Sequence, residues 1–233
     1  MCGRASLGVT KEELESRFGA ILHWEDLENF HPFPNFNMAP SQRLPVITDA
    51  DPYRIQLFRW GLTPSWVKEE KTIPFLINAR SETVAERPAF QQSFLRRRCL
   101  WPVDGYYEWI KVGKDRLPYH VFMPSTSIFT VAGLWDVWKN EAAEEIHSFT
   151  ILTRSADPTM EFLHSRMPVI LPQNLENDWL NSETDPHELL NELPSIGLGT
   201  LKVYRVSGKV NQVKNNSSDL IQEIPDVKQG TLF

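Results

Sequence analysis

The chain begins Met1-Cys2-Gly3-Arg4, so loss of Met1 would leave Cys2 as the N-terminal residue. Cys2 would then carry a thiol and an α-amine on adjacent carbons, an arrangement called a 1,2-aminothiol. A thiol with a pKa near ~8.5 and an α-amine near ~7.7 to 8.0 are each partly nucleophilic at neutral pH. Together these groups can condense with an aldehyde to give a five-membered thiazolidine ring. The alternative interpretation is that Cys2 is an ordinary small residue at the start of the chain.

Further along the chain, polar side chains occur among apolar ones. Asn78 and Arg80 follow the apolar run Phe75-Leu76-Ile77, where a buried strand would end. Glu108 lies between aromatic residues, and loss of water around a carboxylate raises its pKa toward values that suit proton transfer. The other candidates are His164 with Arg166, Arg4 beside Cys2, and the segment Trp60–Trp66 with its two indoles.

Each of these candidates also has a structural interpretation. An amide can cap a turn, a carboxylate can pair with an arginine, a histidine can be hydrogen-bonded in the core, and tryptophans can fill the core. No single position therefore decides the function.

Composition limits the class of protein. The chain has 233 residues, of which 41% are hydrophobic and 23% are charged, as expected for one globular domain spanning 1–233. Cys2 and Cys99 are too few for a disulfide framework, and no Cys/His cluster predicts a metal or another cofactor. The sequence contains neither a secretory signal pattern nor an apolar run of roughly 18 residues. We therefore expect a cytoplasmic monomer without membrane contact.

The charge distribution leaves room for a nucleic-acid site. Lys and Arg number 24 against 30 Asp and Glu, for a net charge of −6, which is not the basic footprint of a typical nucleic-acid binder. Arginines nevertheless recur near the candidate residues, so a local basic groove on an acidic body is compatible with the sequence.

The pattern of elements predicts an α+β fold that is mainly antiparallel β, a curled sheet or pseudo-barrel with peripheral helices. The predicted strands are 44–49 and 53–60, which form a hairpin, then 98–103, 106–111, 119–123, 127–138, 147–153, 168–171 and 201–206.

Helices are predicted where capping residues precede helical periodicity. Thr10 and Glu13 form a capping box, and the periodicity after them runs on through Ile21 and Leu22. Asp157-Pro158 predicts a second helix, from 157 to about 165, that carries His164. Further helices are expected at 175–181 and 186–193, an ordered loop at 31–40, and a loose tail from about 226.

Taken in order, the motifs of this chain resemble those of the SRAP family, the SOS-response-associated peptidases also known as abasic-site processing proteins. The resemblance runs from Cys2 to about Ile224, with small departures at Trp101 and Ile110. It rests on Met1-Cys-Gly-Arg4, Asn37-Met-Ala-Pro40, Trp60-Gly-Leu-Thr-Pro-Ser-Trp66, Asn78-Ala-Arg-Ser-Glu-Thr83, Arg98-Cys-Leu-Trp-Pro-Val-Asp-Gly-Tyr-Tyr-Glu-Trp109, Ala132-Gly-Leu-Trp135 and His164-Ser-Arg-Met-Pro168.

The resemblance implies covalent DNA repair in the SOS response. Such a protein would bind single-stranded DNA, or its junction with duplex, and crosslink Cys2 to an abasic site as a thiazolidine. Glu108 and His164 would move protons, and Asn78 would position the sugar or the Cys2 terminus. Phosphates would be held by Arg4, Arg80 and Arg166, and neighbouring bases would stack on Trp66 and Trp109.

Two other function classes stay open. Cys2, Asn78, Glu108 and His164 would also suit a cysteine-dependent peptidase of the N-terminal nucleophile type, whose natural self-processing event is removal of Met1. A non-catalytic single-strand binding module, in which Cys2 has no chemical role, is the third possibility.

Overall fold

The computed structural model describes residues 2–23, 34–69, 72, 75–193 and 201–225. Most of the described strands pair antiparallel, so the predicted α+β class with mainly antiparallel strands is confirmed. The predicted loose tail from about 226 lies outside the described residues, as do residues 31–33 of the predicted loop 31–40. No helix of the described chain combines the length and the apolar composition that a membrane crossing requires.

Five strands, in the order β11, β10, β7, β4 and β5, close into a barrel because β5 also pairs with β11. The predicted hairpin of β4 and β5 is confirmed as part of it. Inside the barrel, Trp60, Trp101 and Phe149 are fully buried against one another, with the rings of Trp60 and Trp101 4.7 Å apart. The barrel strands are β4 (Arg43–Thr48), β5 (Asp51–Trp60), β7 (Arg98–Val103), β10 (Phe129–Lys139) and β11 (Glu145–Ser155).

Short strands extend the barrel at its edges. They are β2 (Ile21–Leu22) on β5, β6 (Asn78–Arg80) and β12 (Arg166–Pro168) on β11, and β13 (Ile170–Leu171) on β10. The pairing of β6 is parallel and places Asn78 opposite Ile151. The polar residues after the apolar run 75–77 are therefore held in register with a central barrel strand.

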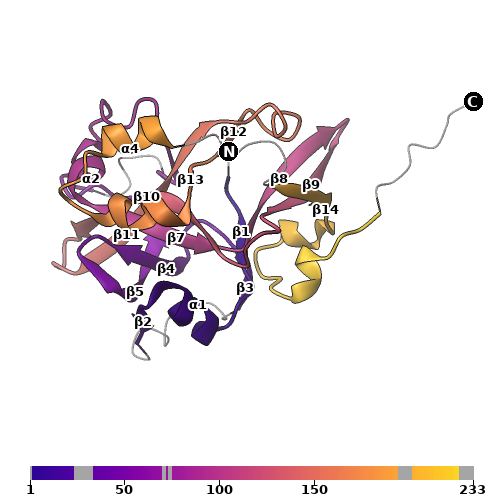
Figure 1. The fold of residues 1–233 in the computed structure, drawn as a ribbon, viewed down its shortest axis with the longest axis horizontal. Helices are drawn as coiled ribbons and strands as arrows, with labels where there is room; N and C mark the ends of the chain where they lie inside the picture. Colours follow the sequence, from indigo (N-terminus) through magenta and orange to yellow (C-terminus); the bar gives the residue numbers. More distant parts are fainter. Residues whose placement is uncertain (1, 24–33, 70–71, 73–74, 194–200, 226–233) are drawn as a thin grey trace, which may run out of the picture.

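A second sheet of five strands lies beside the barrel, and the N-terminal strand β1 belongs to it (Figure 1). Figure 1 shows β1 running between the barrel strands and the β8–β9–β14 ribbon. The strands of this sheet are β14 (Lys202–Arg205), β9 (Asp115–Phe122), β8 (Gly105–Val112), β1 (Ala5–Leu7) and β3 (Asn35–Met38), in that order. Cys2, just before β1, thereby comes to the junction of the two sheets.

A buried polar chain fastens β1 in this sheet. Ser6 Oγ donates to Asp104 and lies 2.9 Å from His120 Nε2, while the Gly8 N–H donates to Asp104 Oδ2 at 2.6 Å. Burial lowers the pKa of His120 to about 4 and raises the pKa of Asp104. The His120 ring is therefore neutral at pH 7. The strand β1, which follows Cys2, is tied to Asp104 just before β8 and to His120 on β9 through partly or fully buried hydrogen bonds, which are costly to break.

The helices are short and peripheral. Thr10 and Glu13 form the predicted capping box of α1, but the helix ends at Phe18 because Gly19 takes the left-handed conformation, φ 62°, and Ile21 and Leu22 then form β2. The helices are α1 (Lys11–Phe18), α2 (Gln91–Arg96), α3 (Glu176–Leu180) and α4 (Pro186–Glu192), with 3-10 turns at Gln173–Leu175, Gly208–Asn211 and Ser218–Ile221.

Two predicted elements are wrong. The segment after Asp157 is a series of turns rather than a helix, because Ala156 N–H donates to Ser165 O and closes it into the loop that joins the paired strands β11 and β12. Asn35–Met38, predicted as loop, is strand β3, which pairs with β1 despite the prolines around it. Helix α2 was not predicted from the sequence.

Candidate active site

Cys2 is buried, with 1% of its surface exposed. Its Sγ lies 3.7 Å from the Arg4 carbonyl oxygen, to which the thiol donates. Burial and the neighbouring Glu108 carboxyl both raise the pKa of the thiol. The thiol is therefore protonated in this arrangement and needs a base before it can act as a nucleophile. Met1 lies outside the described residues.

The Glu108 carboxyl is close enough to the Cys2 thiol to raise its pKa. It lies on β8, is 5% exposed, and burial raises its pKa to about 7. A carboxyl group with this pKa is about half ionised at neutral pH, so it can both accept and return a proton. Burial thus raises the pKa of this carboxyl in the direction predicted from the sequence, while its role in proton transfer stays a prediction.

Tyr106 was missed by the sequence analysis. It is two residues before Glu108 on β8, and alternate residues of a strand share a face. Its hydroxyl is buried, and burial together with the nearby Cys2, Glu108 and Asp157 raises its pKa well above the usual range. The period of two along β8 is the signal that could have placed Tyr106 with Glu108.

Asn78 connects the barrel to the N-terminal segment. Its Nδ2 donates to the Cys2 carbonyl at 3.0 Å. Its Oδ1 is buried and accepts no hydrogen bond from the described residues. Since buried polar atoms nearly always have a partner, this oxygen is an acceptor that a substrate hydroxyl or the freed Cys2 amine would satisfy.

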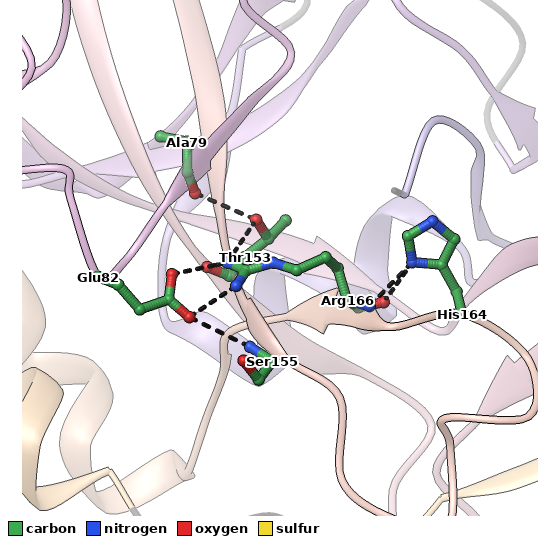
Figure 2. A network of polar contacts seen from close by, with 6 residues as sticks. All are labelled: Ala79, Glu82, Thr153, Ser155, His164 and Arg166. Atoms are coloured by element: carbon green, nitrogen blue, oxygen red, sulfur yellow. Dashed lines mark hydrogen bonds and ion pairs between the residues drawn. The ribbon is translucent and has the colours of Figure 1, made fainter.

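His164 lies at the end of the loop before β12, where a backbone group fixes its orientation (Figure 2). The Arg166 N–H donates to His164 Nδ1 at 2.9 Å, and the Arg166 carbonyl oxygen lies 3.2 Å from the same nitrogen. Because the shorter contact makes Nδ1 an acceptor, we assign the proton of the neutral ring to Nε2. Partial burial, followed by the positive charges nearby, lowers the pKa of the imidazole. At neutral pH the ring can therefore donate through Nε2.

Arg166 is engaged with protein groups. Its guanidinium donates to both carboxylate oxygens of Glu82, at 2.6 and 2.8 Å, and also to the Thr153 carbonyl (Figure 2). The ion pair lowers the pKa of Glu82. A phosphate at Arg166 would have to share or replace this bidentate pair, and such a planar pair is among the stronger side-chain contacts.

Arg4 and Trp109 both contact the C-terminal segment. Arg4 donates to Asn37 Oδ1 and to the Val210 carbonyl, each at 2.7 Å, and the Trp109 indole donates to Asn211 Oδ1 at 2.8 Å. Arg4 thus ties the N-terminal strand to β3 and to the 3-10 turn at Gly208–Asn211. Arg4 and Trp109 are therefore engaged with other parts of the protein, unlike the exposed candidates Arg80 and Trp66.

Trp66, Asn78 and Arg80 line one hollow of about 470 Å³. Trp66 is 58% exposed and Arg80 is also exposed, so an indole face and a guanidinium are both open to solvent there. The hollow is completed by Leu76, Thr83, Arg87, Pro88, Ala89 and Phe90. Arg87 was not among the candidates from sequence, because nothing in the order of residues shows that the chain after Arg80 returns to the same surface.

Among the described residues, no group of three or more His, Cys, Asp or Glu side chains is arranged to hold a metal ion. The groups at this site that can react or transfer protons are the Cys2 thiol, the Glu108 carboxyl and the His164 imidazole, with the Asn78 amide beside them. The fold and the site define a class: a closed β-barrel with a second sheet, in which a cysteine at the start of the chain meets a carboxyl group that titrates near neutral pH.

The chain belongs to the SOS response associated peptidase (SRAP) family, whose model matches residues 1–213. The abasic site processing protein YoqW of Bacillus subtilis is 37% identical over 229 residues, covering 95% of this chain and 99% of that protein. The abasic site processing protein HMCES of Xenopus tropicalis is 27% identical, covering 96% of this chain and 78% of that protein.

The fold is likewise shared with solved structures. A crystal structure of a protein from Bacteroides thetaiotaomicron superposes with a TM-score of 0.86 at 25% identity, covering 96% of this chain and all of that one. A protein from Bordetella bronchiseptica superposes with a TM-score of 0.76 at 26% identity, covering 88% of this chain.

Proposed function

We propose that this chain processes abasic sites in DNA by capturing the open-chain aldehyde of the lesion on Cys2 after Met1 has been removed. The observation that carries the proposal is the pairing of a buried Cys2 thiol with Glu108, whose pKa of about 7 suits proton transfer at neutral pH. The names of the curated relatives given above, abasic site processing proteins, support the same substrate.

The proposed reaction starts at the Cys2 α-amine. The amine attacks C1′ of the aldehyde, and the resulting carbinolamine loses one water to form an imine. The thiol sulfur then bonds to the imine carbon while its proton passes, through Glu108, to the imine nitrogen. The product is a thiazolidine, and the sum of the steps is aldehyde plus aminothiol giving thiazolidine plus water.

The other site residues have distinct roles in this proposal. Asn78 holds the Cys2 carbonyl and offers its Oδ1 to the amine or to a sugar hydroxyl. His164 donates from Nε2 to the sugar oxygen as the closed hemiacetal opens. Arg4 and Arg166 act mainly through their protein partners, by holding the N-terminal strand and the His164 loop in place.

The hollow beside Asn78 is the proposed path of the DNA strand. Arg80 and Arg87 supply positive charge for phosphates, and Trp66 supplies a ring face for a base next to the lesion. Base stacking on an aromatic side chain is worth about 1 to 3 kcal/mol and tolerates any sequence, as a lesion reader requires. The charge is local, since the whole chain carries −6.

Denaturing electrophoresis of the protein mixed with a single strand that bears one abasic site tests this function. A protein band shifted by the mass of the DNA supports covalent capture. Cleavage of supplied peptides without a shifted band would instead support the cysteine peptidase. If neither a shifted band nor peptide cleavage is seen, only non-covalent binding remains.

The Arg80→Ala variant is expected to bind undamaged single strands with a flatter salt dependence. Each phosphate contact on a single strand contributes a slope of about −0.7 to log affinity against log salt, so one lost contact flattens the slope by about that much. Fluorescence anisotropy at four or five salt concentrations measures it. Arg116→Ala, which alters an exposed arginine near the start of β9, is the control. An unchanged slope in Arg80→Ala would place the phosphates elsewhere.

His164→Ala is expected to lengthen the lifetime of the finished adduct several-fold. A group that assists ring opening also assists the reverse reaction, by microscopic reversibility. The decay is followed by trapping released abasic DNA with a competing aldehyde-reactive amine. His23→Ala, an exposed histidine outside the site, serves as the control. Decay as fast as in the parent would leave His164 with a structural role only.

A further inference from the structure

Trp66 is exposed although it lies in a segment whose backbone is firmly held. It occupies the third position of the turn Pro64–Val67, which Val67 N–H closes by donating to the Pro64 carbonyl at 3.1 Å. Thr63 before the turn and Val67 at its end are buried, whereas the Trp66 side chain is 58% exposed. Leaving a large indole exposed on a fixed turn costs hydrophobic free energy, and the fold itself does not require this exposure.

Two side chains of β10 hold the turn on either side of Trp66. The Ser65 N–H donates to Asp136 Oδ2 at 2.8 Å, and the Trp138 indole N–H donates to the Val67 carbonyl at 2.6 Å. Asp136 and Trp138 are alternate residues of one strand and therefore share a face. Both are buried, at 2% and 6% exposure, so water competes little for these hydrogen bonds.

Asp136 is itself fixed. Its Oδ1 pairs with Arg97 and accepts the Val137 N–H, which leaves Oδ2 to accept from Ser65. Upstream, the Thr63 N–H donates to Ser148 Oγ on β11 at 2.9 Å. The backbone is thus anchored to two barrel strands at residues 63, 65 and 67, and the indole between the last two anchors is left to face the hollow with Asn78 and Arg80.

We propose that Asp136 and Trp138 are positioning residues that fix Trp66 as a rigid stacking platform for a base beside the lesion. The proposal rests on the proposed function in one respect, that Trp66 stacks on DNA. A side chain whose backbone is already ordered loses less conformational freedom when a base stacks on it, so the anchors raise affinity without touching the DNA.

A double-mutant cycle with Trp138→Phe and Trp66→Ala tests the proposal. Phenylalanine keeps an aromatic ring in the packing but has no N–H to donate to Val67. We expect Trp138→Phe to weaken binding of an undamaged single strand about fivefold, the low end of one stacking contact. In a Trp66→Ala background the same substitution should have no further effect, because nothing is left to position.

Two controls separate positioning from general damage. Trp179→Phe removes an equally buried indole hydrogen bond, to the Cys99 carbonyl on β7, and should bind DNA as the parent does. With saturating abasic DNA, Trp138→Phe should crosslink at the parent rate, which also shows that the variant is folded. The crosslinking rate at saturating DNA tests the proposed function, whereas the affinity for undamaged DNA tests the anchoring of Trp66.

Three outcomes would overturn the proposal: parent affinity in Trp138→Phe, the same fold-loss of affinity in the Trp66→Ala background, or parent affinity in Trp66→Ala itself. By contrast, absence of any crosslink from the parent protein would overturn the proposed function and leave this affinity test intact.

Discussion

Cys2→Ala is expected to abolish the heat-stable, unreduced adduct with abasic DNA while leaving affinity for undamaged single strands nearly unchanged. The thiazolidine needs both the sulfur and the nitrogen of Cys2, and alanine provides only the α-amine. The amine can still form an imine, which does not survive heating but becomes permanent when borohydride reduces it. Denaturing electrophoresis with and without borohydride measures both species.

Cys99→Ala is the matched control for the loss of a thiol. Cys99 is also fully buried, but it lies on β7 inside the barrel. In the Cys99→Ala variant, the adduct on Cys2 should form at the parent rate. A heat-stable, unreduced adduct formed by Cys2→Ala would contradict the thiazolidine and require another nucleophile.

Glu108→Gln is expected to slow crosslink formation by ~10²-fold or more at neutral pH, the usual range for loss of a general base. Glutamine keeps the size of the side chain but cannot accept the thiol proton. The thiol depends on this acceptance, since burial and Glu108 raise its pKa. The rate is measured in single-turnover reactions with excess protein.

The pH profile makes the assignment of Glu108 specific. In the parent, the ionised, proton-accepting form grows as the pH rises through about 7, so the rate should rise across that range. In Glu108→Gln this inflection should be lost, and only the titration of the α-amine should remain. Glu176→Gln, which alters a buried glutamate paired with Arg17 away from the site, should keep the parent profile. A parent-like profile in Glu108→Gln would exclude Glu108 as the base.

The sequence contains enough information for the strands but not for every connection. Alternation and turn residues predicted the β4–β5 hairpin and the central strands, because these signals are local. The helix after Asp157 was wrong because a good N-cap says nothing about the strand pairing at Ser155 and Arg166 that makes the segment a hairpin loop. The strand Asn35–Met38 was missed because its pairing with β1 outweighs the local effect of proline.

The candidate site shows the same limit. Glu108 could be predicted because a carboxyl group within an apolar, aromatic stretch of strand is expected to be buried, and it is. Its neighbours in sequence, Tyr107 and Trp109, belong to a different cluster on the other face of β8. The partners of the arginines could not, because the Glu82 that pairs with Arg166 is 84 residues away and the Val210 that accepts from Arg4 is 206 residues away. The sequence around an arginine does not show whether its guanidinium is available to bind a phosphate or is already hydrogen-bonded within the protein.

Intact-mass measurement after mixing the protein with an oligonucleotide that bears a single abasic site tests covalent capture by Cys2 most directly. We expect one new species whose mass equals the chain without Met1 plus the oligonucleotide minus one water, and we expect it to be absent with Cys2→Ala. Unmodified masses alone, or the same adduct on a chain that still carries Met1, would contradict the account, because an acylated Cys2 nitrogen cannot form the imine.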